Sequence, residues 1–169
     1  MSGGAHTHDP KAPPRIAILT ISDTRTLETD SSGAAIESLA SAAGWPIAGR
    51  AIVRDEPAEI AEAIRRFCAD PAVDAVVATG GTGVAPRDRT PETLEPLFER
   101  RLDGFGELFR TVSFQEVGAR AILSRATAGV ISGRIVFALP GSEAAVRLAM
   151  ERLLIPVAGH IVAELKRRG

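Results

Sequence analysis

Four short apolar runs alternate along the chain with longer stretches of helical periodicity. The runs are RIAILTIS, IAGRAIV, DAVVA and RIVFAL, at residues 15–22, 47–53, 74–78 and 134–139. Apolar runs without a polar residue at every second position are typical of strands buried on both faces of a parallel sheet. Strands that alternate with helices predict one three-layer α/β/α domain, whose mostly parallel sheet is joined by right-handed crossovers.

Helical patterns fill the segments between these runs. We expect helices over 31–44, 57–70, 91–102, 104–110, 117–129 and 143–154, and a last helical segment after Pro156. Pro57 suits the first turn of its helix, whereas Pro96 and Pro156 are expected to split helices because proline lacks an N–H. The segment 1–14 is rich in Gly, Pro and His, so we expect a disordered arm there and a folded domain over 15–169.

The composition argues against several classes of protein. The net charge is −1 with acidic and basic residues interspersed, whereas nucleic-acid-binding domains carry a basic patch. No apolar stretch approaches the roughly 20 residues that cross a bilayer, so we expect no membrane segment and no export signal. Cys68 is the single cysteine, which predicts a buried thiol and a reducing, cytoplasmic setting. Lys11 and Lys166 are the only lysines, so phosphate chemistry in the core would proceed without a lysine.

Polar and glycine-rich residues follow each of the four predicted strands. They are Ser22-Asp23, Asp55-Glu56, the loop TGGTG with Asp88 beyond it, and Pro140-Gly141-Ser142. In open α/β sheets, ligands bind outside the carboxyl ends of the strands, at the point where the strand order reverses. We therefore expect all four segments to open onto one edge of the sheet.

Each of these segments also has a purely structural interpretation. The glycines could simply turn the chain, Asp55 could cap a helix, Asp23 could start a turn, and Asp88 could pair with a neighbouring arginine. The loop lacks the GK[ST] of a Walker A motif and the spacing of GxGxxG. Taken together, however, bare backbone N–H groups suit phosphate oxygens, and adjacent carboxylates suit Mg²⁺ bridging to the same oxygens. The pattern indicates phosphoryl or nucleotidyl transfer that depends on positioning and charge neutralisation.

Six separated motifs resemble, in the same order, those of the MoaB/Mog family of molybdenum cofactor biosynthesis proteins, which includes the G domain of gephyrin. The motifs are TISDTRTLETDSSG, VRDEP, TGGTGVAPRDRTPE, GFGELFR, AILSRATAG and FALPGSEAAV. The resemblance covers nearly all of the chain from Arg15 onward, and the SDTR and FALPGS segments are closer to the MoaB branch. It implies a molybdopterin-binding α/β domain that assembles as a homotrimer or hexamer.

The resemblance also implies a reaction and its residues. Active members transfer AMP from ATP to the terminal phosphate of molybdopterin with Mg²⁺ and release pyrophosphate, and a separate partner protein would then insert molybdenum. The family's two important aspartates correspond to Asp55 and Asp88, which we expect to be catalytic and to hold Mg²⁺. The expected substrate-binding residues are Ser22, Asp23, Thr79, Gly80, Gly81, Thr82, Gly83, Ser124, Pro140, Gly141 and Ser142.

One position departs from the family pattern. Ala138 stands where adenylylating members often carry Asn, and the change removes a donor and an acceptor that could contact the nucleotide. A molybdopterin-binding or interaction protein of the same pathway, without catalysis, is therefore the alternative to the transferase.

Overall fold

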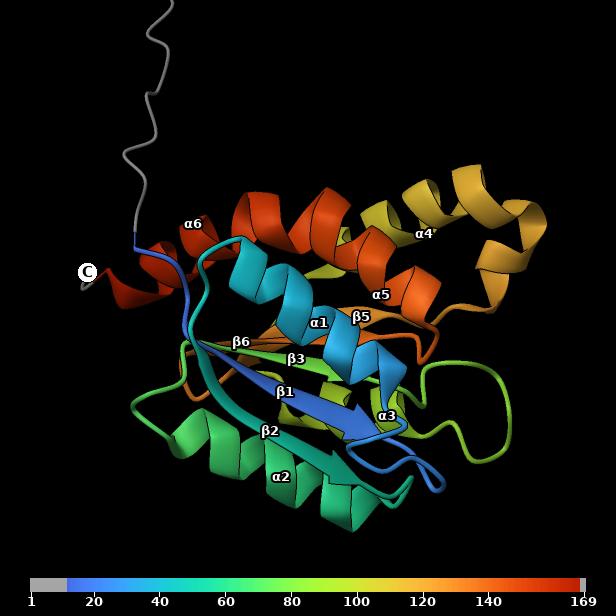
Figure 1. Ribbon diagram of the computed structural model, residues 1–169, viewed down its shortest axis with the longest axis horizontal. Coiled ribbons are helices and arrows are strands. Elements are labelled where there is room, and N and C mark those ends of the chain that lie inside the picture. Colours follow the sequence, from blue (N-terminus) through green and yellow to red (C-terminus); the bar gives the residue numbers. More distant parts are fainter. Residues whose placement is uncertain (1–11, 168–169) are drawn as a thin grey trace, which may run out of the picture.

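The computed structural model describes residues 12–167, which form a six-stranded sheet covered by helices (Figure 1). The strands are β1 (Ile16–Ile21), β2 (Ile47–Val53), β3 (Ala75–Thr79), β4 (Arg100–Arg101), β5 (Thr127–Ile131) and β6 (Arg134–Leu139). Their order is β2-β1-β3-β6-β5-β4; the first four run parallel, whereas β5 pairs antiparallel with β6 and β4 with β5. The expected mostly parallel sheet is confirmed, and it has an antiparallel edge besides.

Helices form a layer on each face of the sheet. One layer holds α1 (Ser31–Ala42), α4 (Asp103–Val117), the 3₁₀ segment η2 (Gly118–Leu123), and the run α5 (Glu143–Ala149), η3 (Met150–Leu154) and α6 (Ile155–Lys166). The other layer holds α2 (Pro57–Ala69), α3 (Thr90–Leu94) and the 3₁₀ turn η1 (Glu95–Leu97). Figure 1 shows the first layer above the sheet and the second below it, which confirms the three-layer α/β/α fold.

The side chains of each strand are divided between two cores. Ile16 and Ile18 of β1 pack with Phe137 of β6 in the core under α1, α5 and α6. Ala17 and Leu19, which alternate with them, belong to the core under α2. Because burying one large apolar side chain contributes about 1.5–3 kcal/mol, both helical layers are held firmly to the sheet. The apolar runs without alternation are explained by this burial on two faces.

The predicted helix over 91–102 is wrong beyond Leu94. Pro96 lies in the 3₁₀ turn η1, and the chain then extends so that Arg100 and Arg101 pair with β5. Proline ends the helix as its chemistry predicts. The edge strand β4 was missed because two exposed arginines give no apolar signal.

The predicted helix over 117–129 is also wrong in part. The piece expected at 104–110 belongs to the longer helix α4, which ends at Val117, and η2 follows. The chain then forms β5, a hairpin partner of β6. Gly129 hides this strand in the sequence, because glycine is a poor strand former. The structure requires glycine there, since a Cβ atom would lie 2.3 Å from the Phe98 ring.

Pro156 does not divide the last helical region. The run from Glu143 to Lys166 stays helical, and η3 is a π-helical segment just before the proline. The N–H of Ile155 donates to the carbonyl of Met150, five residues back. The wider turn accommodates Pro156, which has no N–H to donate.

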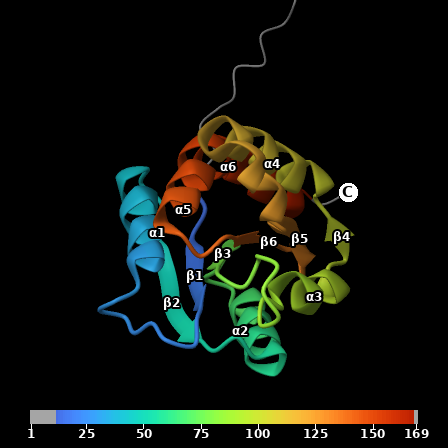
Figure 2. The same cartoon turned by 90° about the vertical axis from the view of Figure 1, so that its right-hand side faces the viewer.

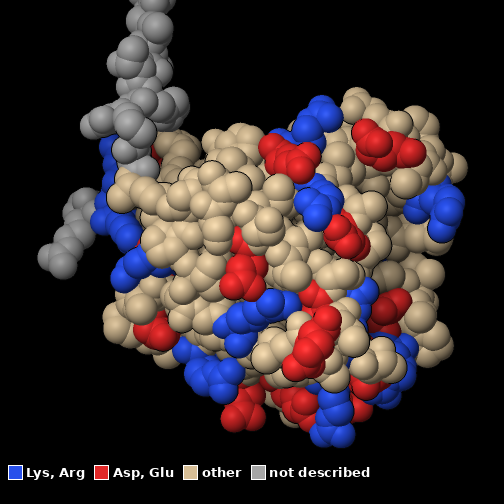
Figure 3. Space-filling model, in the orientation of Figure 1, with Lys and Arg blue, Asp and Glu red and all other residues tan. Residues whose placement is uncertain are grey.

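Four further expectations concern the N-terminal arm, Cys68, membrane spans and the surface charge. The arm expected at 1–14 lies, as far as Lys11, outside the described residues. Cys68 is buried as predicted, and burial raises the pKa of its thiol to about 11. Within residues 12–167, the helices are too short or too polar to cross a membrane. On the face seen in Figure 3, acidic and basic side chains are interspersed.

Candidate functional site

The four strand-end segments meet at one edge of the sheet. Figure 2 looks onto this edge, where the loop after β3 lies centrally in front of the parallel strands. The chain passes from β1 outward to β2 and then back to β3 on the other side of β1, so the strand order reverses between β1 and β3. A cleft of about 870 Å³ opens at this reversal and is lined by Ser22, Asp55, Gly80 and Gly141 among others. The predicted position of a ligand site thus has a cavity.

The glycine loop needs its glycines for space as well as for conformation. Gly80 and Gly81 have φ angles of 110° and 66°, in the left-handed region that side chains rarely adopt. A Cβ atom on Gly80 would lie 2.1 Å from the carbonyl oxygen of Ile21. One on Gly81 would lie 2.3 Å from Oγ1 of Thr90, whose hydroxyl donates to the Gly80 carbonyl at 2.9 Å. The loop is therefore packed directly against the end of β1 and the start of α3.

Asp55 lies beside this loop with an unsatisfied oxygen. Its Oδ1 is buried and has no hydrogen-bond partner among residues 12–167, and a Cβ atom on Gly81 would approach it to 2.8 Å. Burial and then the neighbouring carboxylates of Asp23 and Asp88 raise the pKa of Asp55. An unpaired buried oxygen costs about 1–3 kcal/mol unless something binds it. The carboxylate of Asp55 can therefore bind a cation or accept a hydrogen bond from a ligand.

Asp88 lies beside Gly83 of the glycine loop and also lines the cleft. Its Oδ2 accepts a hydrogen bond from the N–H of Ala85 at 2.8 Å. A Cβ atom on Gly83 would approach the same oxygen to 2.7 Å. The short loop from Gly83 to Asp88 therefore folds around this carboxylate and fixes its direction.

Asp23 does not line the cleft, so its expected contact with substrate has no support in the geometry. Its carboxylate forms an ion pair with Arg87, with Oδ2 at 2.7 Å from Nε. Its Oδ1 accepts the backbone N–H of Asp55 at 3.1 Å. Arg87 also pairs with Glu56 at 3.0 Å, so one guanidinium joins the loops after β1, β2 and β3. Asp23 is a positioning residue for Asp55.

Hydroxyl groups converge on the cleft from several loops. Oγ of Ser22 accepts the N–H groups of Thr24 and Arg25, Oγ of Ser142 caps α5, and Ser124 follows η2. Thr82 is 1% exposed, and its Oγ1 has no hydrogen-bond partner in the part of the chain that the structure describes. Each of these hydroxyls lines the cleft and can still donate its hydrogen to a ligand.

Thr79 and Pro140 tie the glycine loop to the last strand-end turn. The Thr79 hydroxyl donates to the Pro140 carbonyl at 2.8 Å. Gly141 is so close that a Cβ atom on it would lie 3.4 Å from Cα of Gly80. The two turns therefore form one continuous backbone surface at the base of the cleft.

Arg125 contacts the glycine loop from outside the cleft lining, and the sequence analysis did not single it out. Its Nε donates to the Gly83 carbonyl and its Nη2 to the Asp88 carbonyl, both at 2.7 Å. Its own N–H donates to Thr82, and it forms an ion pair with Glu92. Arg125 therefore holds the glycine loop through the carbonyls of Thr82, Gly83 and Asp88. Its place directly after Ser124 in the LSR segment was the available signal.

The walls above the loops were also missed. The cleft continues between α4 with η2 and α5 with η3, where Phe109, Arg120, Leu148 and Arg152 line it. These side chains come from amphipathic helices, whose sequence pattern does not distinguish a cleft wall from a core.

Ala138 lies away from the cleft. It is 1% exposed and packs in the core under α2, with Val136 and Ala78 nearby in the same cluster. A nucleotide contact at position 138 has no support in the geometry, since this residue points to the opposite layer from the α4 and α5 walls. The departure from the family pattern removes no group from the cleft lining.

Asp55 and Asp88 are the residues that could hold a metal ion. In residues 12–167, no three His, Cys, Asp or Glu side chains are grouped as a complete metal site. Mg²⁺ commonly binds one or two carboxylates and takes its other ligands from substrate phosphates and water. The unsatisfied Oδ1 of Asp55 beside the glycine loop fits such an ion.

The fold and the cleft define a doubly wound α/β protein with a glycine loop and two carboxylates at its switch point. The family described as the probable molybdopterin binding domain matches residues 17–160. The chain belongs to this family, within the MoaB/Mog group of molybdenum cofactor biosynthesis proteins.

Relatives named as molybdenum cofactor biosynthesis proteins match this chain along almost its whole length. Molybdenum cofactor biosynthesis protein B of Bacillus subtilis is 47% identical over 163 residues, or 95% of this chain and 96% of that protein. A crystal structure of molybdenum cofactor biosynthesis protein B has a TM-score of 0.91 and 43% identity, covering 95% of this chain and 100% of that one. A structure of MogA has a TM-score of 0.80 at 25% identity, covering 89% and 99%. This chain is therefore more similar to that MoaB protein than to that Mog protein.

Proposed function

We propose that this protein is a molybdopterin adenylyltransferase, which uses Mg²⁺ and ATP to attach AMP to the terminal phosphate of molybdopterin. The observation that carries the proposal is the pair Asp55 and Asp88 beside the glycine loop, with Oδ1 of Asp55 buried and unsatisfied. The proposal is supported by relatives named for molybdenum cofactor biosynthesis. It places the chain in the biosynthesis of that cofactor.

The size of the cleft supports two substrates. Clefts for small ligands span roughly 300–1,000 Å³, and this one, at about 870 Å³, is near the upper end. Its inner part has the glycine loop and the carboxylates, and its outer part lies between the walls that contain Phe109 and Leu148. The arrangement suits phosphates at the base and larger groups between the helices.

The residues of the chain bind and orient the reacting phosphates. Backbone N–H groups of the loop from Gly81 to Gly83 and the hydroxyls of Thr82 and Ser142 donate to phosphate oxygens. Asp55 and Asp88 would hold Mg²⁺, which when bound would supply positive charge to offset that of the phosphates. Arg125 keeps the carbonyls of Gly83 and Asp88 turned away from the phosphates.

The chemical step needs no nucleophile from the protein. An oxygen of the molybdopterin phosphate forms a bond to the α-phosphorus of ATP. The bond from that phosphorus to the bridging oxygen breaks, and pyrophosphate leaves with the electron pair. Because the attacking phosphate is already an anion, no base has to remove a proton, and the protein contributes alignment and charge stabilisation.

The proposal includes assembly into a homotrimer or hexamer and a partner protein that inserts molybdenum into the product. Exposed apolar side chains on α4 and η2 support self-association, because a second copy would cover them. Those outside the cleft lining are Leu108, Phe114 and Ile122.

The test follows adenylylated molybdopterin and pyrophosphate after the purified protein is mixed with molybdopterin, ATP and Mg²⁺. Asp88→Asn keeps an oxygen for the Ala85 N–H but loses the charge, so we expect the rate to fall roughly 100-fold or more. Asp103→Asn is the matched control, because Asp103 is 70% exposed and pairs with Arg101 outside the cleft. Molybdopterin binding without product in the wild type would overturn the transferase and favour a binding protein of the same pathway.

A further inference from the structure

Arginines supply the positive charge within the cleft. Its lining includes Arg25, Arg120, Arg147 and Arg152. Lys166 is the one lysine among the described residues, and it is bound to Asp74 at 2.7 Å, outside the cleft lining. Arg147 is paired with Glu143 at 2.8 Å, and Arg120 and Arg152 belong to the outer walls. Arg25 alone among these four comes from a loop that follows a parallel strand.

Several contacts fix the position of Arg25. Its backbone N–H donates to Oγ of Ser22 at 3.2 Å, and its Nη1 donates to Oγ of Ser32 at 2.5 Å. Nη2 donates to the carbonyl of Gly141 at 3.3 Å, and Oδ1 of Asp30 lies 3.5 Å from Nη1. The guanidinium therefore joins the loop after β1 to the turn after β6, at the base of the cleft.

This arrangement leaves donors for a ligand. A guanidinium has five N–H groups in a planar fork. The contacts of Arg25 use both N–H groups of Nη1 and one of Nη2, while Nε–H and the second N–H of Nη2 have no partner within residues 12–167. The side chain is 30% exposed and lines the cleft. Two adjacent donors of one guanidinium are the arrangement that binds phosphate in a bidentate manner.

The acidic groups at the base of the cleft also favour a positive charge nearby. Asp55 and Asp88 make it acidic, so a phosphate entering there needs a cation besides Mg²⁺. Arg87 is the nearest alternative in the strand-end loops, but its guanidinium is bound to Asp23 and Glu56 and is absent from the cleft lining. Arg25 remains as the cation that the protein itself offers at this end.

We propose that Arg25 is a phosphate-binding residue of the proposed transferase, with Nε and Nη2 donating to one phosphate group of a bound substrate. The phosphate belongs either to ATP or to molybdopterin, and the chemistry is the same for both. The role is one of positioning: Arg25 orients that phosphate between the glycine loop and the Gly141 turn.

If Arg25 had only a structural role, that role would be to stabilise the carboxylate of Asp30. Oδ1 of Asp30 accepts the Gly33 N–H at the start of α1, and its Oδ2 accepts the Thr20 hydroxyl. Arg50 contacts the same carboxylate at 3.0 Å but is not part of the cleft lining. Arg50 is therefore the matched control, because it shares the contact with Asp30 without sharing the cleft.

The experiment compares Arg25→Gln, Arg25→Lys and Arg50→Gln with the wild-type protein by calorimetric titration in Mg²⁺. The probes are ATP, inorganic pyrophosphate, adenosine and molybdopterin, and thermal unfolding checks that each variant is folded. We expect Arg25→Gln to weaken binding of the phosphate-bearing probe about 10- to 100-fold. Arg25→Lys should restore part of that loss because it keeps the charge without the fork, and Arg50→Gln should change it less than about twofold.

The pattern of losses identifies the phosphate. Weaker ATP and pyrophosphate binding with unchanged molybdopterin binding assigns Arg25 to the triphosphate, and the reverse assigns it to the molybdopterin phosphate. Unchanged affinity for every phosphate probe in Arg25→Gln would overturn the inference, as would equal losses in Arg50→Gln or no binding of these probes to the wild type. Since binding is measured without turnover, a protein that binds but does not transfer AMP would refute the transferase and still test Arg25.

Discussion

At the scale of single residues, Asp55 combines a half-buried carboxylate, an oxygen without a hydrogen-bond partner and two acidic neighbours. Burial, then Asp23 and Asp88, raise the pKa of Asp55 above its ordinary value of 3.8. When the pKa of a carboxyl is higher in the folded state than in the unfolded state, its protonated form favours the folded state and its ionised form disfavours it. As the pH rises from the unfolded pKa through the folded one, ionisation therefore lowers the free energy of unfolding.

Replacing Asp55 should stabilise the ligand-free protein while impairing its function. We expect Asp55→Asn to raise the free energy of unfolding at pH 7 by on the order of 0.5 kcal/mol, the size of a like-charge contact near a surface. The gain should shrink as the pH falls toward 4, where the wild-type carboxyl takes up its proton. Urea unfolding without Mg²⁺ at both pH values measures this, with the exposed Glu62→Gln as control. Destabilisation at pH 7 would mean that Asp55 makes a favourable contact in the free protein.

The sequence predicted some site residues and missed others for a physical reason. Asp55 and Asp88 follow strands in a parallel sheet, and topology alone brings such residues to one edge. Two sets of contacts join segments that lie far apart in the chain. They are the ion pair of Asp23 with Arg87 and the hydrogen bonds of Arg125 to the glycine loop. Such pairings depend on loop conformations that no local pattern specifies. The core position of Ala138 follows from the alternation along β6, which the motif comparison ignored.

At the scale of elements, the hairpin of β5 and β6 shows where local patterns fall short. The parallel strands have uninterrupted apolar runs, whereas β5 contains Gly129 and is preceded by helical sequence. Its turn, Ser132-Gly133, has φ angles of 49° and 70°, as in the type I′ turns that join two strands tightly. Such turns favour Asn before Gly, and serine in the first position obscured the signal.

The same turn yields a prediction about stability. Ser132 is the non-glycine residue with positive φ among the described residues, and a left-handed conformation costs roughly 1–2 kcal/mol for most residues. Asparagine adopts it more readily, so Ser132→Asn should raise the free energy of unfolding by roughly 0.5 kcal/mol. The backbone N–H of residue 132 keeps its bond to Glu99 at 2.7 Å.

Chemical denaturation of Ser132→Asn and of Ser132→Val measures the effect. The valine variant should be destabilised, because a β-branched side chain tolerates positive φ poorly. A valine variant as stable as the wild type would contradict the strained turn.

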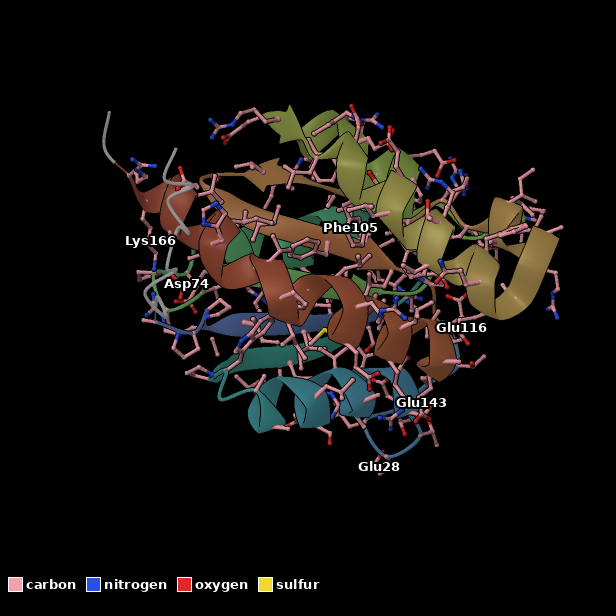
Figure 4. All side chains as sticks on the ribbon, turned by 90° about the horizontal axis from the view of Figure 1, so that it is seen from above. Glu28, Asp74, Phe105, Glu116, Glu143 and Lys166 are labelled. Carbon is pink, nitrogen blue, oxygen red and sulfur yellow. The ribbon has the colours of Figure 1, made fainter. Side chains whose placement is uncertain are left out.

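At the scale of the whole molecule, one end of the sheet carries the candidate site and the other end carries an ion-pair cluster. The cleft lies at the carboxyl ends of the parallel strands, and an ion-pair cluster lies at their amino ends. Asp74 precedes β3 and binds Arg15, which precedes β1, and Lys166, the last residue of α6. Figure 4 shows Asp74 and Lys166 together at one end, and Glu116, which lines the cleft, at the other.

The Asp74 cluster should stabilise the fold without affecting the cleft. The Asp74 side chain is 4% exposed, and its carboxylate accepts the N–H, Nε and Nη2 of Arg15 and Nζ of Lys166. Although burial opposes ionisation, these hydrogen bonds and charges hold the pKa of Asp74 well below its ordinary value. A lowered pKa in the folded state contributes stability above the unfolded pKa of about 3.8, and the contribution is lost as the pH falls below it.

Asp74→Asn should therefore lower the free energy of unfolding at pH 7 by about 2 kcal/mol, since it removes a charge that buried hydrogen bonds depend on. The difference from the wild type should persist down to about pH 4 and narrow only as the pH falls below the unfolded pKa of about 3.8. Glu143→Gln is the control: it breaks an exposed pair with Arg147 and should cost less than about 0.5 kcal/mol. Urea titrations of the three proteins at pH 7 and pH 3 measure these differences, and molybdopterin binding at a temperature where all are folded should be unchanged in Asp74→Asn. Weakened molybdopterin binding in the folded variant would mean that the two ends of the sheet are coupled, against the separation of fold and site that the structure indicates.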